Sequence, residues 1–279
     1  MSKIKIKYSL IWICISCIMV LMILHLIVQQ TKFGIPFVQG YHCDVHFAAP
    51  HSLPKVALLS FPGSGNTWAR HLLELVSGIY TGSASHKKLL YEAGFLGQMD
   101  NGDSGRVIAV KTHRYQPNMS QRYHAIIFLI RNPYGAISAE YNRQHSGKTS
   151  FEPWSEEMVG REEFAVSIRT LLKSWSTLAL KTLSNYTERP LLVVHYEDLV
   201  DHTAEQMHTI LRFLNVTVKE DRFLCLKMSS EGEFHRDMPT DERRRQHDIL
   251  KSLGLDFERR IKYASSLLIA RGFPPVHPF

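Results

Sequence analysis

The stretch Val56-Ala57-Leu58-Leu59-Ser60-Phe61-Pro62-Gly63-Ser64-Gly65-Asn66-Thr67-Trp68 decides the fold of this chain. Residues 56–60 form an apolar run of strand length, and a turn rich in proline and glycine follows it. Apolar residues then recur with the period of a helix as far as Gly78, a residue typical of a helix C-cap. The stretch therefore predicts a buried strand, a short loop and a helix.

The loop between this strand and helix suits an anion. Small residues let backbone N–H groups point inward at a helix N-terminus, where unpaired donors and the helix dipole attract phosphate or sulfate. The loop lacks the lysine that follows the last glycine of nucleotide-hydrolase P-loops, because Asn66 and Thr67 follow Gly65 here. A tight strand-to-helix turn without a ligand is the alternative interpretation.

Length and charge set limits on the function. The chain has 279 residues, enough for one large α/β domain with a short appendage. Its net charge is +7, which suits an anionic ligand, but the basic residues are too dispersed to indicate nucleic acid. The fifteen histidines and four cysteines show no zinc-site spacing, so we expect no metal.

Residues 8–28 are almost wholly apolar and long enough to span a bilayer. They lack the short apolar core and small-residue cleavage site of a signal peptide. Lys3, Lys5 and Lys7 precede them, so the positive-inside rule places residues 1–7 in the cytosol. This pattern predicts a type II signal anchor, a stem over 29–54 and a lumenal domain over 55–279.

Two further features suit a lumenal domain. Three N-x-[ST] sequons occur, at Asn118, Asn185 and Asn215, and they indicate a glycoprotein. Cys43 and Cys225 are the two cysteines beyond the predicted anchor, and the compartment would permit a disulfide between them.

Further strands and helices alternate along the chain. Strands are predicted at 106–113, 124–130 and 190–196, and helices at 133–145, 161–184 and 203–214. Alternation of this kind indicates a doubly wound parallel sheet, in which ligands bind beyond the carboxyl ends of the strands. Candidate site residues lie at the ends of four different strands, namely 63–68, 111–113, 131 and 196. We therefore expect them to converge at one edge of the sheet.

Four ordered motifs resemble those of sulfotransferases that use 3′-phosphoadenylyl sulfate (PAPS). The loop 61–68 resembles their 5′-phosphosulfate loop, and Arg131-Asn132-Pro133 with Ser138 resembles their 3′-phosphate motif. Lys111-Thr112-His113 looks like the K-T-H strand end of the cytosolic branch, and residues 196–199 look like the family's Y-E-D-L. The amino-acid sequence of the loop is most similar to that in membrane-anchored WSC-domain-containing sulfotransferase-like proteins, but the cysteine-rich WSC module is missing. The resemblance implies a P-loop NTPase-like sulfotransferase fold.

Sulfuryl transfer assigns roles to three of these residues. His113 is the candidate general base, because an imidazole titrates near neutrality. Lys111 would stabilise the sulfuryl group or the bridging oxygen, and Arg131 offers a bidentate fork to the 3′-phosphate. The alternatives are a hydrogen-bonded loop histidine, an exposed strand-end lysine and a capping or ion-pair arginine.

The resemblance also implies which residues hold the donor. They are Pro62, Gly63, Ser64, Gly65, Asn66, Thr67, Trp68, Arg131, Ser138, Tyr196 and Arg236. Trp68 and Tyr196 would contact the adenine or belong to the core, and Arg236 belongs to a charged loop that would close over the nucleotide.

Two positions depart from the family pattern. The family usually has Lys or Arg at the position of Gly63, so Lys111 or Arg70 substitutes for that side chain or the activity is weak. Ser138 follows Arg131 by seven residues instead of eight, a rotation of about 100° on a helix.

We expect a Golgi enzyme that transfers a sulfuryl group from PAPS to a hydroxyl of a glycan, sialylated glycans included. The acceptor would be a free glycan, glycoprotein or glycolipid, and residues 8–28 would contact the lipid bilayer. A catalytically silent anchored protein that binds nucleotide or glycan is the alternative, while the missing P-loop lysine disfavours a phosphotransferase.

Overall fold

The computed structural model describes residues 43–145, 153–232 and 238–279, together with Met19. Asp44–Phe279 forms one compact unit, and Met1–Cys43 belongs to another. The predicted span 8–28 lies outside the described residues except for Met19. Among the residues that are described, no helix is both long and apolar enough to cross a membrane.

Five parallel strands form the sheet, in the order β2-β3-β1-β4-β5. Their bounds are β1 Val56–Ser60, β2 Gly82–Ser83, β3 Val110–Thr112, β4 Ala125–Ile130 and β5 Leu191–His195. In the register, Leu59 of β1 pairs with Thr112 of β3 and with Phe128 of β4. The predicted α/β class and parallel sheet are therefore confirmed, and β1 lies in the middle.

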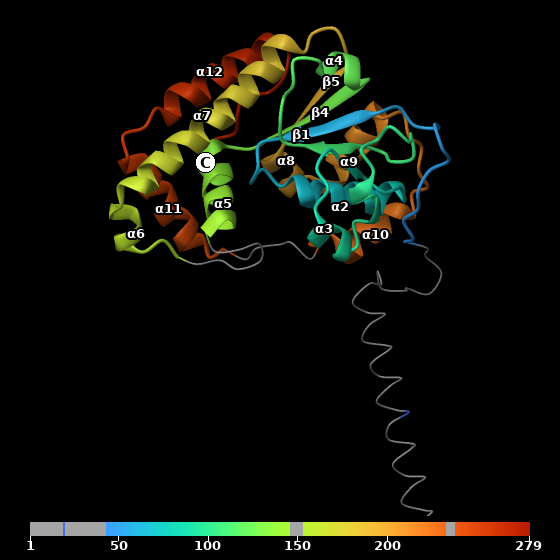
Figure 1. Cartoon of the computed structure of the whole chain (residues 1–279), viewed down its shortest axis with the longest axis horizontal. Helices are drawn as coiled ribbons and strands as arrows, with labels where there is room; N and C mark the ends of the chain where they lie inside the picture. Colours follow the sequence, from blue (N-terminus) through green and yellow to red (C-terminus); the bar gives the residue numbers. More distant parts are fainter. Residues whose placement is uncertain (1–18, 20–42, 146–152, 233–237) are drawn as a thin grey trace, which may run out of the picture. The chain divides into compact units, whose positions relative to one another are not determined.

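Helices cover both faces of this sheet (Figure 1). The side chains of Ala57, Leu59, Ile126 and Phe128 join one core cluster with residues of α5, α7, α11 and α12. The other layer contains α2, α9 and α10. Because both faces of β1 and β4 are covered, all their residues are buried, as expected for strands of a parallel sheet.

The helices have the following bounds: α2 Asn66–Ser77, α3 Lys88–Glu92, α4 Met119–Arg122, α5 Pro133–His145, α6 Glu156–Gly160, α7 Glu162–Asn185, α8 Tyr196–Asp201, α9 Thr203–Phe213, α10 Arg222–Ser229, α11 Thr240–Ser252 and α12 Phe257–Ala270. A 3₁₀ turn, η1, spans Leu96–Met99. The predicted helices at 133–145, 161–184 and 203–214 correspond to α5, α7 and α9. The predicted strand at 106–113 is shorter, because only residues 110–112 pair with neighbours.

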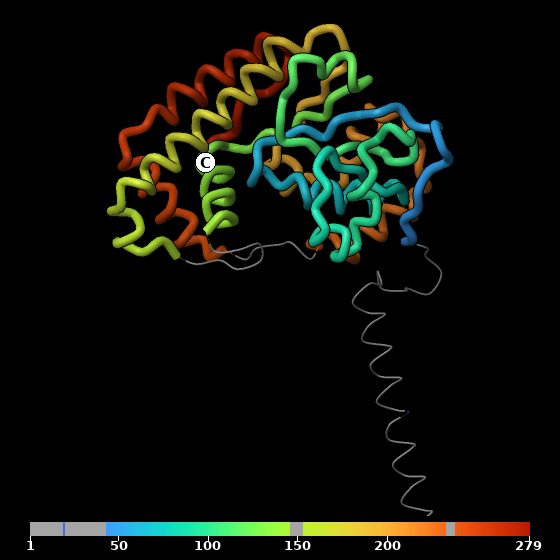
Figure 2. The backbone as a smooth tube through the Cα atoms, in the orientation of Figure 1, coloured from blue at the N-terminus to red at the C-terminus, as the bar shows by residue number. Residues whose placement is uncertain are grey.

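Residues 44–54, which the sequence analysis assigned to the stem, belong to the folded unit (Figure 2). His46 bridges to Ile79, and the backbone N–H of Ala48 donates to the carbonyl of Arg106. These bonds extend the domain eleven residues before the predicted start at Lys55. Cys43 and Cys225 are both disulfide-bonded, which agrees with the redox prediction.

Candidate active site

The loop after β1 turns sharply into α2. Gly63 and Gly65 both have φ near +83°, at +83° and +84°, a region that only glycine enters without strain. The amide of Asn66 donates to the carbonyl of Leu58 and to the hydroxyl of Ser60, both at 3.0 Å. Asn66 therefore fastens the start of α2 to the end of β1 and fixes the shape of the loop.

Position 63 has no room for a side chain. A Cβ atom there would lie 2.2 Å from the carbonyl oxygen of Ala136 and 2.9 Å from the backbone nitrogen of Glu140, both in α5. Backbone atoms of a helix cannot move aside as the end of a flexible side chain can. The glycine is thus required by the packing of α5 against the loop, and the family's usual lysine or arginine has no place here.

Gly63→Ala should destabilise the protein more than a matched glycine substitution does. Gly272 is the control, because its φ is +77° and a Cβ there would meet nothing within 4 Å. Gly272→Ala should cost about 1–2 kcal/mol for backbone strain alone, whereas Gly63→Ala should cost about 1–3 kcal/mol more for overpacking. Unfolding in urea measures the free energy of unfolding of both variants. Equal losses of stability would show that α5 moves away from residue 63 at no cost in free energy.

Lys111 comes from the carboxyl end of β3 and reaches the loop. Its ammonium donates to the hydroxyl of Thr67 at 3.1 Å, and its side chain is 6 % exposed. Burial, together with the positive charges of Arg70, Lys87 and Arg143, lowers the pKa of Lys111 to about 7. A cation held at the N-terminus of α2 suits an anion that binds in the loop.

His113 follows Lys111 by two residues and has a defined tautomer. Its Nδ1 lies 2.9 Å from the carbonyl oxygen of Ser60. Because a carbonyl only accepts, Nδ1 carries the proton and Nε2 keeps its lone pair. Burial, and next the charge of Lys111, lowers the pKa of His113 to about 3, so the ring is neutral at physiological pH. The ring is ready to accept a proton at Nε2.

Arg131 and Tyr196 bring the ends of β4 and β5 to the same loop. The guanidinium of Arg131 donates from Nη1 to the carbonyl of Gly63 at 2.9 Å and lies 4.1 Å from the centre of the Tyr196 ring. A Cβ on Gly65 would come within 2.6 Å of that ring. The predicted convergence of four strand ends is therefore observed, and Arg131 also has a structural contact.

Trp68 and Tyr196 contact each other edge to face, with centroids 5.9 Å apart. The indole N–H of Trp68 donates to the carbonyl of Ser230 at 2.6 Å. This bond fastens α2 to the chain after α10, and the contact of Trp68 with the adenine stays a prediction. Arg236 lies outside the described residues.

Ser138 is not brought to the loop. It is buried in α5, and two residues of helix rotate it about 200° from Ala136, whose carbonyl faces Gly63. Its predicted contact is with the 3′-phosphate, which is assigned to Arg131 and not to the loop, and that contact stays a prediction. Arg70 likewise cannot replace a side chain at position 63.

The guanidinium of Arg70 is fully buried and committed elsewhere. It donates to the hydroxyl and carbonyl of Thr81 at 2.7 and 3.1 Å and to the side chain of Gln98 at 2.7 Å. Glu74, one turn along α2, accepts from the backbone N–H of Thr81 at 2.9 Å. Burial lowers the pKa of Arg70 to about 10 and raises that of Glu74 to about 7. Arg70 acts on Lys111 only as a nearby charge.

Sequence reasoning missed two groups that support the site. Asn132 caps α5 by accepting from the N–H of Tyr134 at 2.9 Å, and its own backbone N–H donates to Glu197 at 2.9 Å. Its amide also donates to the carbonyl of His277 at 2.7 Å, and the ring of His277 pairs with Asp198 at 2.9 Å. The Y-E-D-L motif contains Glu197 and Asp198 and could have indicated these contacts. No sequence pattern around residue 277 indicated the part of His277.

The second missed group is an ion pair on α5 between a buried carboxylate and a partly exposed guanidinium. Arg143 donates from Nε and Nη2 to the two carboxylate oxygens of Glu140, both at 2.6 Å. The side chain of Glu140 is only 3 % exposed, while that of Arg143 is 36 % exposed. Both residues act electrostatically on Lys111: the charge of Arg143 lowers its pKa and that of Glu140 raises it.

The residues present fit a phosphosulfate group. The hydroxyl oxygen of Ser64 is buried and has no hydrogen-bond partner among the described residues. Its O–H group is therefore available to donate to a bound anion. Lys111, Arg131 and the N-terminus of α2 supply positive charge around it. Within the described ranges, no three His, Cys, Asp or Glu side chains lie close enough together to hold a metal ion.

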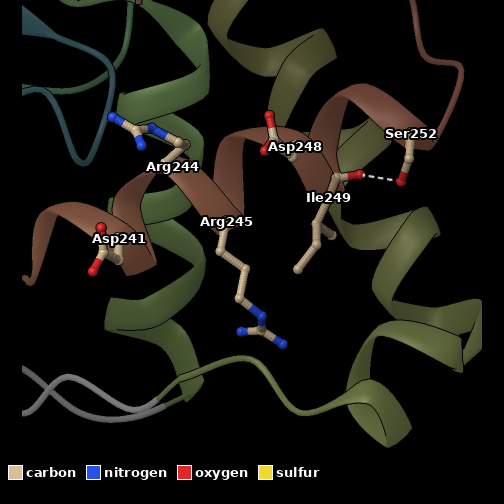
Figure 3. A pocket seen from close by; sticks show the side chains of 6 residues that line it. All are labelled: Asp241, Arg244, Arg245, Asp248, Ile249 and Ser252. Atoms are coloured by element: carbon tan, nitrogen blue, oxygen red, sulfur yellow. Dashed lines mark hydrogen bonds between the residues drawn. The ribbon is translucent and has the colours of Figure 1, made fainter.

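A surface hollow elsewhere does not belong to this site. Six residues of α11 line it, namely Asp241, Arg244, Arg245, Asp248, Ile249 and Ser252 (Figure 3). The guanidinium of Arg245 donates to the carbonyl of Trp154 at 2.5 Å and to Glu242 at 3.2 Å. The hollow is therefore lined by one face of α11, and no predicted site residue lines it.

Comparison with known proteins gives a family and several relatives. The description "Sulfotransferase domain" matches residues 53–230. The "WSCD family member CG9164" of Drosophila melanogaster is 36 % identical over 211 residues, which cover 72 % of this chain and 66 % of that protein. The "WSCD family member AAEL009094" of Aedes aegypti is 34 % identical over 194 residues, which cover 69 % and 60 %. The chain thus spans less than two thirds of the length of these relatives.

Solved structures of similar proteins include mouse sulfotransferase SULT7A1 complexed with PAP, at a TM-score of 0.45 and 18 % identity, covering 66 % of each chain. A sulfotransferase from Alicyclobacillus acidocaldarius has a TM-score of 0.42 and 15 % identity, covering 77 % of this chain and 96 % of that one. At these identities and TM-scores, neither structure is evidence for the roles of the site residues.

Proposed function

Because this chain belongs to the family of proteins with a sulfotransferase domain, we propose that it transfers a sulfuryl group from PAPS to a hydroxyl of a glycan acceptor. The observation that carries the proposal is the placement of Lys111 at the anion-suited loop, with the neutral ring of His113 two residues away. PAPS supplies an activated sulfuryl group when it is bound. The chain supplies a clamp for the donor, a cation and a base.

Each residue has a distinct part in this proposal. The loop 61–67 and Ser64 hold the phosphosulfate end of the donor, and Lys111 places its charge there. Arg131 holds the 3′-phosphate, and Tyr196 sets the position of the guanidinium. His113 accepts the hydroxyl proton of the acceptor at Nε2.

Incubation of the full-length protein with radiolabelled PAPS and a panel of sialylated and neutral glycans tests the proposed reaction. We expect label in at least one glycan and none when the donor is omitted. A protein that binds PAPS tightly but labels no glycan, glycoprotein or glycolipid would instead be the silent anchored protein. The absent side chain at position 63 is the observation that favours this second candidate.

We also propose that the protein is a single-pass type II protein of the Golgi membrane with its domain in the lumen. Three exposed asparagines, Asn118, Asn185 and Asn215, present their sequons to solvent and so support a glycosylated lumenal domain. Endoglycosidase treatment of the protein from eukaryotic cells should shift its band on a gel. A band that does not move would count against this location.

A further inference from the structure

The packing of α5 against the loop raises the question of what replaces the missing cation. The position where a Cβ would project from Gly63 is filled by the backbone of α5, between Ala136 and Glu140. Arg70 is held by Thr81 and Gln98 and cannot turn to the loop. Lys111 supplies one positive charge at the loop. A second positive charge would have to come from another side chain.

Helix α5 carries a cation on the face that touches the loop. Ala136, Glu140 and Arg143 lie four and three residues apart and therefore share one face of the helix. Long side chains in helices lean toward the N-terminus, which directs Arg143 back toward Glu140 and the loop. Glu140 is buried and holds Nε and Nη2 of the guanidinium, and within residues 43–145, 153–232 and 238–279 no hydrogen bond occupies the N–H groups of Nη1.

The charge of Arg143 acts on both reactive residues. The positive charge of Arg143 contributes to lowering the pKa of Lys111 and also that of His113, although these two residues come from a different element. Among the described charged groups, Lys87 acts on both residues in the same direction, and Glu140 opposes the effect on Lys111. Arg143 is fixed by a bidentate ion pair with Glu140.

We propose that Arg143, positioned by Glu140, contacts the transferring sulfuryl group and supplies the cation that a side chain at position 63 cannot supply. This inference rests on the proposed function. In the transfer, the bond between sulfur and the phosphate oxygen breaks, and its electron pair leaves with that oxygen. A new bond joins sulfur to the acceptor oxygen, whose proton passes to Nε2 of His113. The guanidinium stabilises the negative charge on the sulfuryl oxygens throughout.

Steady-state kinetics and binding of the desulfated product PAP test this proposal. Arg143→Ala should lower turnover roughly 10²–10³-fold, the range for loss of one preorganised donor. Its affinity for PAP should stay within about twofold of wild type, because PAP lacks the sulfuryl group. Arg143→Lys should recover part of the turnover, since it keeps the charge but loses the bidentate contact.

The control is Arg259→Ala, which removes an arginine from another (i,i+3) ion pair. Arg259 pairs with Asp256 at the start of α12, and its side chain is 78 % exposed. This variant should keep wild-type turnover.

A raised KM for the acceptor at unchanged turnover in Arg143→Ala would overturn the proposal, because it would make Arg143 an acceptor-binding residue. Wild-type kinetics in Arg143→Ala would also overturn it.

A measurement without donor gives an independent readout. NMR titration of labelled lysine side chains should show the pKa of Lys111 rising above about 7 in Arg143→Ala and falling in Glu140→Gln. It should stay unchanged in Arg259→Ala. No change in either α5 variant would mean that Arg143 lies too far from the site. If wild-type protein transfers no sulfate to any acceptor, the proposed function itself fails, an outcome distinct from a failure of Arg143 alone.

Discussion

Replacement of His113 by alanine should lower turnover by roughly 10²–10⁴-fold and leave affinity for PAPS nearly unchanged. The ring is held by the carbonyl of Ser60 at Nδ1, which leaves Nε2 as the basic atom. Loss of the ring removes the group that takes the proton but removes no contact with the donor. Stopped-flow or steady-state turnover, with donor affinity from calorimetry, checks this expectation.

His113→Asn separates a catalytic from a structural role. An asparagine amide can still donate to the carbonyl of Ser60, but it has no basic lone pair. We expect it to be as inactive as the alanine variant. Recovery of wild-type turnover in His113→Asn would show that the histidine only fastens β3 to β1. His124→Ala, at an exposed site before β4, is the control and should be fully active.

The pH dependence of kcat/KM should follow the shifted pKa values. The basic form of His113 persists down to a pH of about 3, so the acidic limb expected near the ordinary histidine pKa should be absent between pH 5 and 7. The sequence analysis chose His113 because an imidazole titrates near neutrality, and that reasoning overlooked the burial of the ring. Lys111 is charged only below its pKa of about 7, so kcat/KM should fall as pH rises past that value. Lys111→Arg should move this alkaline limb upward, because arginine stays protonated.

Replacement of Arg131 by alanine should weaken PAPS binding by about 2–4 kcal/mol, a factor of roughly 30 to 1000. The guanidinium is buried beside Tyr196 at the carboxyl end of β4, and in the proposed complex its loss would remove a bidentate charged contact with the 3′-phosphate. Calorimetric titration with PAP or PAPS measures the change.

Adenosine 5′-phosphosulfate, which lacks the 3′-phosphate, is the control ligand. It should bind Arg131→Ala and wild type alike if the arginine acts on the 3′-phosphate. Equal weakening of both ligands would contradict that role and would mean that Arg131 acts through its bond to the carbonyl of Gly63. Unfolding in urea should be measured in parallel, because the same bond supports the loop.

The sequence predicted the elements whose signal is local. Each long strand is a run of buried apolar residues, and Pro133 marks the first residue of α5, so these bounds follow from hydrophobic pattern and turn chemistry. The polar residues after the strands then converge because parallel strands end at one edge. The short strand β2 was missed, since Gly82 and Ser83 have no strand propensity and pair only because β3 lies beside them.

Features set by tertiary packing had no such signal. Arg70 looks like a free cation near the loop, but Thr81 and Gln98 bury it, and both belong to segments that the sequence marks only as polar loops. Gly63 looks like the loss of a functional lysine until α5 is seen to fill that space. The contacts that correct both interpretations join residues far apart in the chain, so no local pattern contains them.

The junction at Asn132 has a consequence for the order in which the protein is made. Its amide bonds to a carbonyl 145 residues later in the chain, while its backbone N–H bonds to Glu197, 65 residues later. During synthesis, β1, the loop and α2 leave the ribosome long before residue 277 does. Asn132 therefore completes its hydrogen bonds only after almost the whole domain has been translated. Any nascent chain that stalls before α12 would carry β1, the loop and α2 without the contact that Asn132 makes with His277.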